Sequence, residues 1–347
     1  MAAVPDKQPT IFDVAELAGV SKSLVSRVMR GVGGVSADKA ERVRQAAKTL
    51  GYVPSAMASS LASSGGRFLG VILRNARLPF YGYLHTAMQR RAREHGYQIV
   101  AISGVDELSA QDVQDAFRDL IAFRVAGMIV CSATLTADDF RPFVNRVPII
   151  VAGHEEETGT VSSVYCDEAD GGHKLAQYVM DYGHRHIAVF VLDEAYSFSQ
   201  HRRGITMSEQ LRASGVEPVT ITVDSPDHVS HAVEEALRFP ALTALMCPSD
   251  PFMLKVMGEL RNRGVSVPED ISVSGYDGIG DLASPYLDFT TYRQPLDEIG
   301  YRAVDAVLDA MNGHSQVRSL AIPGVLVPGR TVRYPRSMTF TADATVA

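Results

Sequence analysis

PTIFDVAELAGVSKSLVSRVMRG, residues 9–31, contains two short helical patterns separated by a tight break. Thr10 is followed three residues later by Asp13, a spacing that caps the start of a helix and complements its positive end. Gly19 tolerates the dihedral angles of a sharp turn, and Ser21 can cap a second helix over 22–29. A connection this short between two helices predicts a helix-turn-helix unit.

A third helix is expected after Ser36, and Gly51 is placed to end it. Apolar side chains recur at helical periods in all three segments, so we expect one small core that can fold as a unit of about fifty residues. The predicted core residues are Val14, Leu17, Ala18, Val20, Val25, Val28, Val43, Ala46, Ala47 and Leu50.

The charge of the chain is unevenly distributed. The 347 residues carry a formal net charge of −7, which by itself argues against DNA binding, because a phosphate-binding surface needs Lys and Arg. Residues 1–64, however, hold eight basic and five acidic side chains, 8 − 5 = +3, so the remainder carries −10. A basic head therefore precedes an acidic body.

The second predicted helix has an outer face suited to DNA. Lys22, Ser23 and Arg27 lie at its start and on its outer side, where the side chains of a recognition helix reach base edges in the major groove. An ordinary solvated helix face is the alternative interpretation.

Residues 9–31, continued by VSADKAERVRQAAKTLGYVPSAMASSLA at 35–62, resemble the head and hinge of the LacI/GalR family of transcription regulators. The resemblance implies that Lys22 and Ser23 occupy the variable base-reading positions of that family and Arg27 its near-constant contact. The operator sequence would then depend mainly on Lys22 and Ser23.

Three hydroxyl side chains, Thr10, Ser21 and Ser26, would clamp DNA phosphates together with backbone amides at helix starts. Such contacts position the head without specifying sequence. The alternative is that these residues are only helix caps.

Residues 55–62 form the predicted hinge. Met57, Ala58 and Leu61 stand at helical spacing, but an isolated helix this short is unstable in water, so we expect it to become ordered on DNA. By the family resemblance, paired Leu61 side chains of a dimer would enter the minor groove between base steps. A flexible Ser/Ala linker is the other interpretation.

From residue 68 onward, short apolar runs alternate with amphipathic segments, the pattern of βαβ units. The first series is FLGVIL, a helix near 83–95, QIVAIS, a helix near 109–123, GMIV and PIIVAG. The second is SSVY, a helix near 169–182, IAVFVL, a helix near 202–213, VTITV, 229–237, ALMC, 251–263 and ISVSGY. Two parallel sheets flanked by helices are implied.

In such folds, ligands bind beyond the carboxyl ends of the strands, in the cleft between two lobes. The stretches LRNARLPFYGYLHTAM, CPSD and SVSGYDGIGD resemble landmarks of the same family in order. By that resemblance Phe80 and Tyr81 form an aromatic wall, Asp277 accepts ligand donors, and Ser249 with Asp250 lines the second lobe.

Three departures weaken the assignment of a sugar ligand. Gly153 stands where many members have Asp, Ser249 where many have Asn, and His201 where Arg is usual. Arg202 can replace the missing guanidinium only if it is not turned to solvent, because one residue rotates a helical side chain by about 100°. His154 and His201 offer imidazole contacts to an aromatic or anionic effector, although a lone His is more often a surface or packing residue.

The sequence therefore predicts an α/β protein with a small all-α helix-turn-helix head and a two-lobed periplasmic-binding-protein-like core. The expected boundaries are 1–52 for the head, 53–66 for the hinge and linker, 67–335 for the effector-binding and dimerisation core, and 336–347 for a disordered tail. A homodimer would match a palindromic double-stranded operator. Its small-molecule effector would be a sugar or related metabolite.

Other classes fit less well. We found no convincing catalytic motif, and neither a cofactor nor a metal is expected, so an enzyme is not favoured. A solute-binding carrier would share the core but not the head. A transcription activator of the same fold stays open. The first residues lack the pattern of an export signal, and Cys131, Cys166 and Cys247 are expected as buried thiols in a cytoplasmic protein.

Overall fold

The computed structural model describes residues 9–29, 31–53, 67–104, 110–314 and 317–336. Contacts divide the chain into two units, the head, Met1–Arg67, and the core, Phe68–Ala347. The predicted hinge residues Met57, Ala58 and Leu61 lie outside the described residues. No helix within the described ranges is long and apolar enough to cross a membrane.

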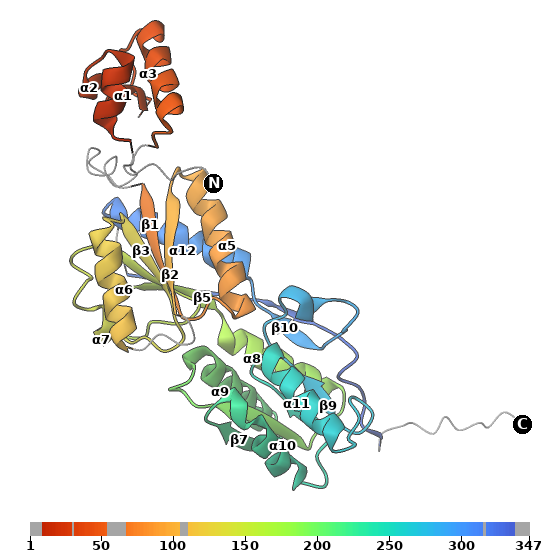
Figure 1. Cartoon of the computed structure of the whole chain (residues 1–347). Coiled ribbons are helices and arrows are strands. Elements are labelled where there is room, and N and C mark those ends of the chain that lie inside the picture. Colours follow the sequence, from red (N-terminus) through yellow and green to blue (C-terminus); the bar gives the residue numbers. More distant parts are fainter. Residues whose placement is uncertain (1–8, 30, 54–66, 105–109, 315–316, 337–347) are drawn as a thin grey trace, which may run out of the picture. The chain divides into compact units, whose positions relative to one another are not determined.

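The head is a bundle of three helices, α1 Ile11–Ala18, α2 Lys22–Met29 and α3 Ala37–Leu50 (Figure 1). One side chain departs from the predicted core: Leu17 is 54% exposed. Three short helices enclose only the side of α1 that carries Val14 and Ala18, so Leu17 is left on the outside. The buried residues of the head are Val14, Ala15, Ala18, Val25, Val43, Ala46 and Ala47.

The ends of the head helices follow the predicted local signals. Asp13 accepts hydrogen bonds from the backbone N–H (2.6 Å) and the hydroxyl (2.8 Å) of Thr10, while Thr10 Oγ1 accepts the N–H of Asp13. This reciprocal pair is a capping box. Gly19 ends α1 and Gly51 ends α3 in the left-handed conformation, at φ 63° and 64°, which a residue with a Cβ adopts only with strain.

The first lobe of the core is a six-stranded parallel sheet in the order β11-β5-β4-β3-β1-β2. Its strands are β1 Phe68–Leu73, β2 Gln98–Ser103, β3 Gly127–Cys131, β4 Ile149–Ala152, β5 Ser162–Cys166 and β11 Ser319–Ile322. Helices α5 Pro79–Glu94 and α12 Leu296–Met311 cover one face, while α6 Ala110–Ala122 and α7 Ala137–Phe140 cover the other (Figure 1). Burial of both faces explains why the inner strands β1, β3 and β4 are continuous apolar runs.

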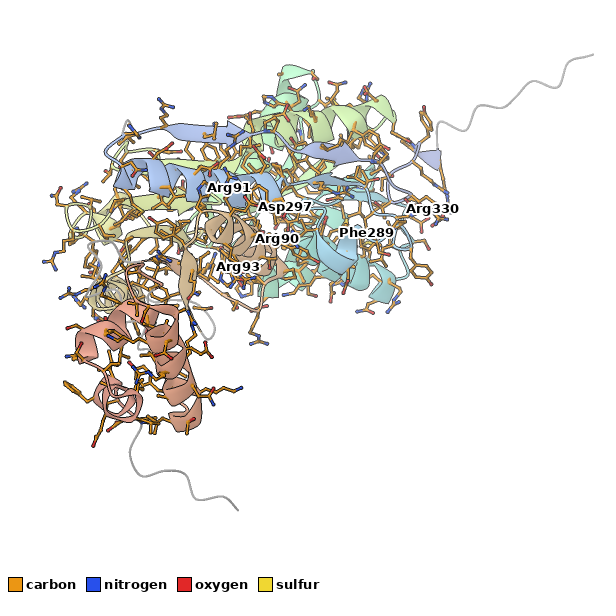
Figure 2. All side chains as sticks on the ribbon, turned by 90° about the horizontal axis from the view of Figure 1, so that it is seen from above. Arg90, Arg91, Arg93, Phe289, Asp297 and Arg330 are labelled. Atoms are coloured by element: carbon orange, nitrogen blue, oxygen red, sulfur yellow. The ribbon has the colours of Figure 1, made fainter. Side chains whose placement is uncertain are left out.

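Charged side chains join the two helices on the first face. Figure 2 shows Arg90, Arg91 and Arg93 on α5. The guanidinium of Arg91 donates from Nε to Asp305 on α12 at 2.7 Å and from Nη1 to Glu94 at 2.9 Å. The pair with Asp305 is partly buried, so it fixes the register of α5 against α12 at the edge of their apolar contact.

The second lobe is a four-stranded parallel sheet in the order β7-β6-β8-β9, with an antiparallel ribbon of β10 and β12 beside it. Its strands are β6 Ile187–Leu192, β7 Val219–Val223, β8 Ala244–Met246, β9 Ser272–Ser274, β10 Thr291–Arg293 and β12 Val325–Val327. Helices α8 Glu168–Asp181 and α9 Phe198–Ala213 cover one face, and α10 Val229–Leu237 and α11 Asp250–Asn262 the other. Two short 3-10 turns, η1 Pro226–His228 and η2 Gly280–Ala283, complete the lobe.

Two predictions about the core need correction. SSVY was expected to open the second series of strands, but β5 belongs to the first sheet, where it pairs with β4 and β11. Helix α9 begins at Phe198, four residues before the predicted start, because Ser197 caps it by accepting the N–H of Gln200. His201 therefore lies inside a helix whose first turn the sequence pattern missed.

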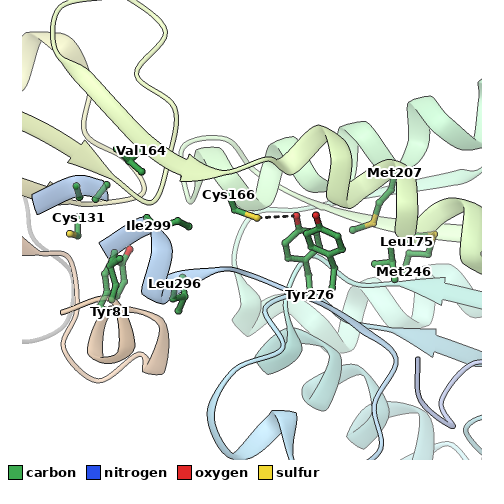
Figure 3. Packing of buried hydrophobic residues seen from close by; sticks show 14 of the residues in the cluster. Tyr81, Cys131, Val164, Cys166, Leu175, Met207, Met246, Tyr276, Leu296 and Ile299 are labelled. Atoms are coloured by element: carbon green, nitrogen blue, oxygen red, sulfur yellow. Dashed lines mark hydrogen bonds between the residues drawn. The ribbon is translucent and has the colours of Figure 1, made fainter. Parts of the chain in front are cut away.

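The two lobes share one apolar cluster. The chain crosses between them at 166–168, 294–296 and 322–325. At the first crossing Cys166 lies beside Tyr276, with 3.8 Å between its sulfur and the phenol oxygen (Figure 3). Side chains of both lobes, among them Tyr81, Leu175 and Met207, belong to this cluster. Cys131, Cys166 and Cys247 are buried free thiols, as predicted.

Candidate functional site

Helix α2 of the head has an exposed outer face. Lys22, Ser23 and Arg27 are all exposed, and Ser23 and Arg27, four residues apart, lie on the same side of the helix. The structure thus presents on one short helix the three side chains that the sequence indicated for base contacts.

The two basic side chains of this face, Lys22 and Arg27, are held by weak contacts. The ammonium of Lys22 lies 4.6 Å from the centre of the Phe12 ring, a cation–π arrangement at an exposed site. The guanidinium of Arg27 donates from Nη2 to the carbonyl oxygen of Gly33 at 2.9 Å. Both groups stay in water. Arg27 can exchange its carbonyl contact for a base edge, and Lys22 can reach one while it stays over the Phe12 ring.

The hydroxyl residues of the head serve as caps in the free protein. Thr10 caps α1, and Ser21 Oγ accepts the N–H of Leu24 at 3.3 Å at the start of α2. A cap leaves further acceptor and donor capacity on a hydroxyl, so this role does not conflict with phosphate contacts. Ser26 is half-buried on α2.

The core contains a cavity of about 680 Å³ between its lobes. The first lobe contributes residues after β3 and β4 and along β5, and the second contributes the starts of α8 and α9. The lining residues are Leu135, Thr136, Ala137, His154, Glu155, Glu156, Glu157, Thr158, Tyr165, Asp167, Glu168, Ala169, Glu194, Phe198, Ser199, His201, Arg202, Ile205 and Ala321. This volume suits a small metabolite.

The structure brings three of the eight predicted effector residues into this lining: His154, His201 and Arg202. His154 is 3% exposed, and desolvation lowers its pKa to about 4. His201 Nδ1 lies 2.8 Å from the carbonyl oxygen of Leu192. Arg202 is exposed at the cavity rim.

The two predicted aromatic residues lie outside the lining. Tyr81 is 5% exposed and belongs to the apolar cluster, where Phe80 packs edge-on against it. Phe80 also fills the space beside Gly153, because a Cβ at Gly153 would lie 3.1 Å from its ring. The Gly153 departure is thus explained by an aromatic ring in the place where a carboxylate was expected.

The three polar residues predicted on the second lobe are buried and hydrogen-bonded to other protein groups. Ser249 caps α11 by accepting the N–H of Phe252 at 3.3 Å. Asp250 accepts the N–H of Gly278 and the hydroxyl of Thr291, each at 2.7 Å. Asp277 accepts from Gln294 at 2.7 Å and from Arg203 at 2.9 Å. None of the three lines the cavity, because their acceptors face protein donors.

Arg203 is the centre of a buried charged cluster that the sequence did not reveal. It is 3% exposed, and its guanidinium binds Glu168 through Nε (2.9 Å) and Nη2 (3.1 Å), as well as Asp277 and the carbonyl oxygen of Pro248 through Nη1. The ring of Tyr276 lies 4.1 Å from the guanidinium carbon. Burial opposes the charge, but the carboxylates of Glu168 and Asp277 raise the pKa of Arg203 above its ordinary value.

Burial disfavours the charged form of the carboxyls in this cluster. Desolvation raises the pKa of Glu168 and of Asp277 above the ordinary carboxyl range. Desolvation, reinforced by the charge of Asp277, raises the pKa of Asp250 to about 7. One guanidinium thus lies among three carboxyls in a nearly dry environment, and its removal would leave them buried without a compensating charge.

A helix-turn-helix head joined to a two-lobed α/β core with a cavity between the lobes defines a class of DNA-binding transcription regulators. Residues 10–55 match the family of bacterial regulatory proteins, lacI family, and residues 176–332 match the periplasmic binding protein-like domain. The chain therefore combines a lacI-type head with a periplasmic-binding-protein-like core.

Relatives extend along nearly the whole chain. The HTH-type transcriptional repressor PurR of Glaesserella parasuis serovar 5 is 28% identical over 313 residues, covering 88% of this chain and 91% of that protein. PurR of Vibrio atlanticus is 29% identical over 315 residues, with 86% and 91% covered. The lac repressor dimer, solved with operator and the anti-inducer ONPF, is 26% identical with a TM-score of 0.83, covering 94% of this chain and all of that one.

Proposed function

We propose that this chain is a sequence-specific transcriptional repressor that binds a palindromic operator as a homodimer and responds to a small-molecule effector. The observation that carries the proposal is α2, which exposes Lys22, Ser23 and Arg27 on a head matching the lacI family. Repression is favoured over activation because the similar PurR proteins are repressors.

On DNA, Lys22 and Ser23 select the operator sequence and Arg27 makes the constant base contact, for which it leaves the carbonyl of Gly33. Thr10, Ser21 and Ser26 contact phosphates and fix the register of the head. Met57, Ala58 and Leu61 form the hinge contact in the minor groove. We retain the boundaries 1–52, 53–66, 67–335 and 336–347 for head, hinge, core and tail.

The effector acts from the cavity between the lobes. Both lobes contribute to its lining, and direct bonds already join them beside it: Phe198 N–H donates to the carbonyl of Ala133 at 3.0 Å, and the hydroxyl of Ser199 donates to that of Gly153 at 3.0 Å. A ligand that strengthens or breaks these contacts changes the relation of the lobes and, through the hinge, operator affinity. His154, His201 and Arg202 are its nearest predicted contacts.

A regulator of this kind carries out no reaction on its ligand, so we assign no catalytic activity. The buried cluster around Arg203 has the perturbed pKa values typical of active sites, but its groups are saturated by one another, which favours a structural role. A DNA-binding regulator works where the chromosome is, so we place the protein in the cytoplasm.

The test is a mobility-shift titration of the purified full chain against DNA from upstream of its own gene, at fixed salt and with unrelated competitor DNA. Tight binding to one site that the competitor does not displace is expected. Binding of the same strength to every sequence would contradict the proposal. A reporter fused to the bound site distinguishes repression, in which deletion of the gene raises expression, from activation, in which it lowers expression.

A further inference from the structure

The cavity lining is unusually acidic for a site expected to hold a sugar or an anion. Among its residues are six carboxyl side chains, from Glu155, Glu156, Glu157, Asp167, Glu168 and Glu194, against one guanidinium, that of Arg202. These residues come from both lobes, so the acidity belongs to the space enclosed by the cleft and not to one loop.

Two of the carboxylates are fully engaged by the protein. Glu168 is bound by Arg203. Glu156 accepts hydrogen bonds from Thr158 and from the backbone N–H groups of Thr160 and Val161; burial opposes ionisation, but these bonds hold its pKa below the ordinary value. Glu156 is therefore a fixed anion at the cavity wall.

Two other carboxylates of the lining are those of Glu157 and Glu194. Within the described residues, Glu157 and Glu194 form no hydrogen bond or ion pair, and both are exposed at the cavity. Glu157 follows β4 in the first lobe, whereas Glu194 follows β6 in the second, so a bridging cation would contact both lobes at once.

The two histidines of the lining offer ring nitrogens to a ligand. His154 is 3% exposed, its lowered pKa keeps it neutral near pH 7, and its Nδ1 has no hydrogen-bond partner in the described part of the chain. Because a carbonyl only accepts, the Nδ1 of His201 beside Leu192 carries the hydrogen. When neutral, His201 therefore has Nε2 as a bare acceptor.

We propose that the cavity binds a small organic cation with several N–H donors, such as a polyamine or a guanidine compound. The buried, unpartnered His154 nitrogen and the free acceptors require donors from the ligand, while the excess of carboxylates requires positive charge. Phe198 and Tyr165 in the lining offer aromatic surface to the ammonium groups, and Ile205 offers apolar surface to a methylene chain. This inference rests on the proposed function, whose effector it describes.

The test is isothermal titration calorimetry of the full chain, without DNA and at low salt, with spermidine and agmatine as cationic probes. Sorbitol serves as a neutral donor-rich probe and citrate as an anionic one. Saturable binding of a cationic probe, weakened by added salt, is expected, with none for sorbitol or citrate. Failure of both amines, or tighter binding of sorbitol or citrate, would overturn the inference.

Variants locate the binding. Glu157→Gln and Glu194→Gln each remove one charge without changing shape, and each should weaken amine binding about tenfold, the loss of one charge-assisted contact. Glu209→Gln, an exposed change on α9 outside the lining, is the matched control and should bind as the unaltered chain does. Equal losses in all three variants would place the amine elsewhere on the acidic surface.

The two proposals fail separately. If the chain binds its operator but no amine, the repressor assignment stands and the ligand class is wrong. If it binds spermidine at the cavity but no specific DNA, the ligand inference stands and the repressor assignment falls.

Discussion

Arg27 of the head and Arg203 of the core lie in opposite environments. Arg27 of the head is exposed and donates a hydrogen bond to a backbone carbonyl, whereas Arg203 of the core is 3% exposed and bound by two carboxylates, a carbonyl and an aromatic ring. A charge that must change partners is kept solvated and loosely held. A charge that fixes architecture is buried and saturated, and its removal leaves its partners without compensation.

The largest effect is expected from breaking the core arrangement. Arg203→Met should destabilise the core by about 3–5 kcal/mol, because Glu168 and Asp277 would remain buried without a cation. Urea unfolding followed by tyrosine fluorescence measures this, since twelve of the thirteen tyrosines lie in the core. Arg202→Met, its exposed neighbour, is the control; similar small losses in both variants would show that the cluster contributes little.

The matching change in the head is Arg27→Ala. It should weaken operator binding by about 1–3 kcal/mol, the usual value of a good base contact, and leave core unfolding unchanged. Mobility shift on the specific site and on unrelated DNA measures the two components. Arg212→Ala in the core is the control, and an equal loss of affinity on both DNAs would mean that Arg27 contacts phosphate only.

Asp250→Asn tests how burial affects a carboxyl of the core cluster. The folded-state pKa of about 7 lies above the unfolded value, so the stability contributed by the protonated group is lost as the pH rises from about 4 to 7. Asn does not titrate, and its Oδ1 can accept the N–H of Gly278 while its amide group donates to the hydroxyl of Thr291. At pH 8 the variant should be more stable by at least about 1.4 kcal/mol, the equivalent of one pKa unit, and near pH 4 it should match the unaltered chain.

Urea unfolding at pH 4.5 and pH 8 gives this difference, with the exposed Asp281→Asn as control. A stability difference that does not change between the two pH values would show that Asp250 is ionised in both folded and unfolded chains.

The smallest effect concerns the ring beside Lys22. Phe12→Leu keeps an apolar side chain but removes the π face, and should lower operator affinity by about 0.5–1 kcal/mol. The same change in a Lys22→Ala background should have no further effect, so a double-mutant cycle isolates the pair. Losses that simply add would mean that Phe12 acts independently of Lys22.

The head was more predictable than the core because its signals are local. Thr10, Gly19 and Gly51 mark helix ends within a few residues, and the periods of Val14 and Val43 mark buried faces. Leu17 was assigned wrongly because helical periodicity gives a face, not the number of neighbours that cover it. In the core, the apolar runs located the strands, but the sheet that receives β5 depends on β11, more than 150 residues later.

The site was less predictable for the same reason. Asp277 was expected to bind ligand, but its partner Arg203 lies 74 residues away, and no local pattern reports that contact. Glu157 and Glu194 stand in loops without periodicity, and only their common position around the cavity gives them meaning. The run of three Glu residues at 155–157 is a local signal in the sequence that could have suggested an acidic site.

Because the chain crosses between the lobes three times, the first lobe cannot finish folding before the second lobe has been made. The first lobe needs α12 to cover the face that Leu84 and Met88 present, and β11 to complete its edge, yet both come after the whole second lobe in the chain. During synthesis, the head is complete before the core begins, while the lobe that follows it keeps an uncovered apolar face until the second lobe has been made. The sensor is therefore the last part of the molecule to be closed, and a truncated product would carry a finished DNA-reading head on an unfinished core.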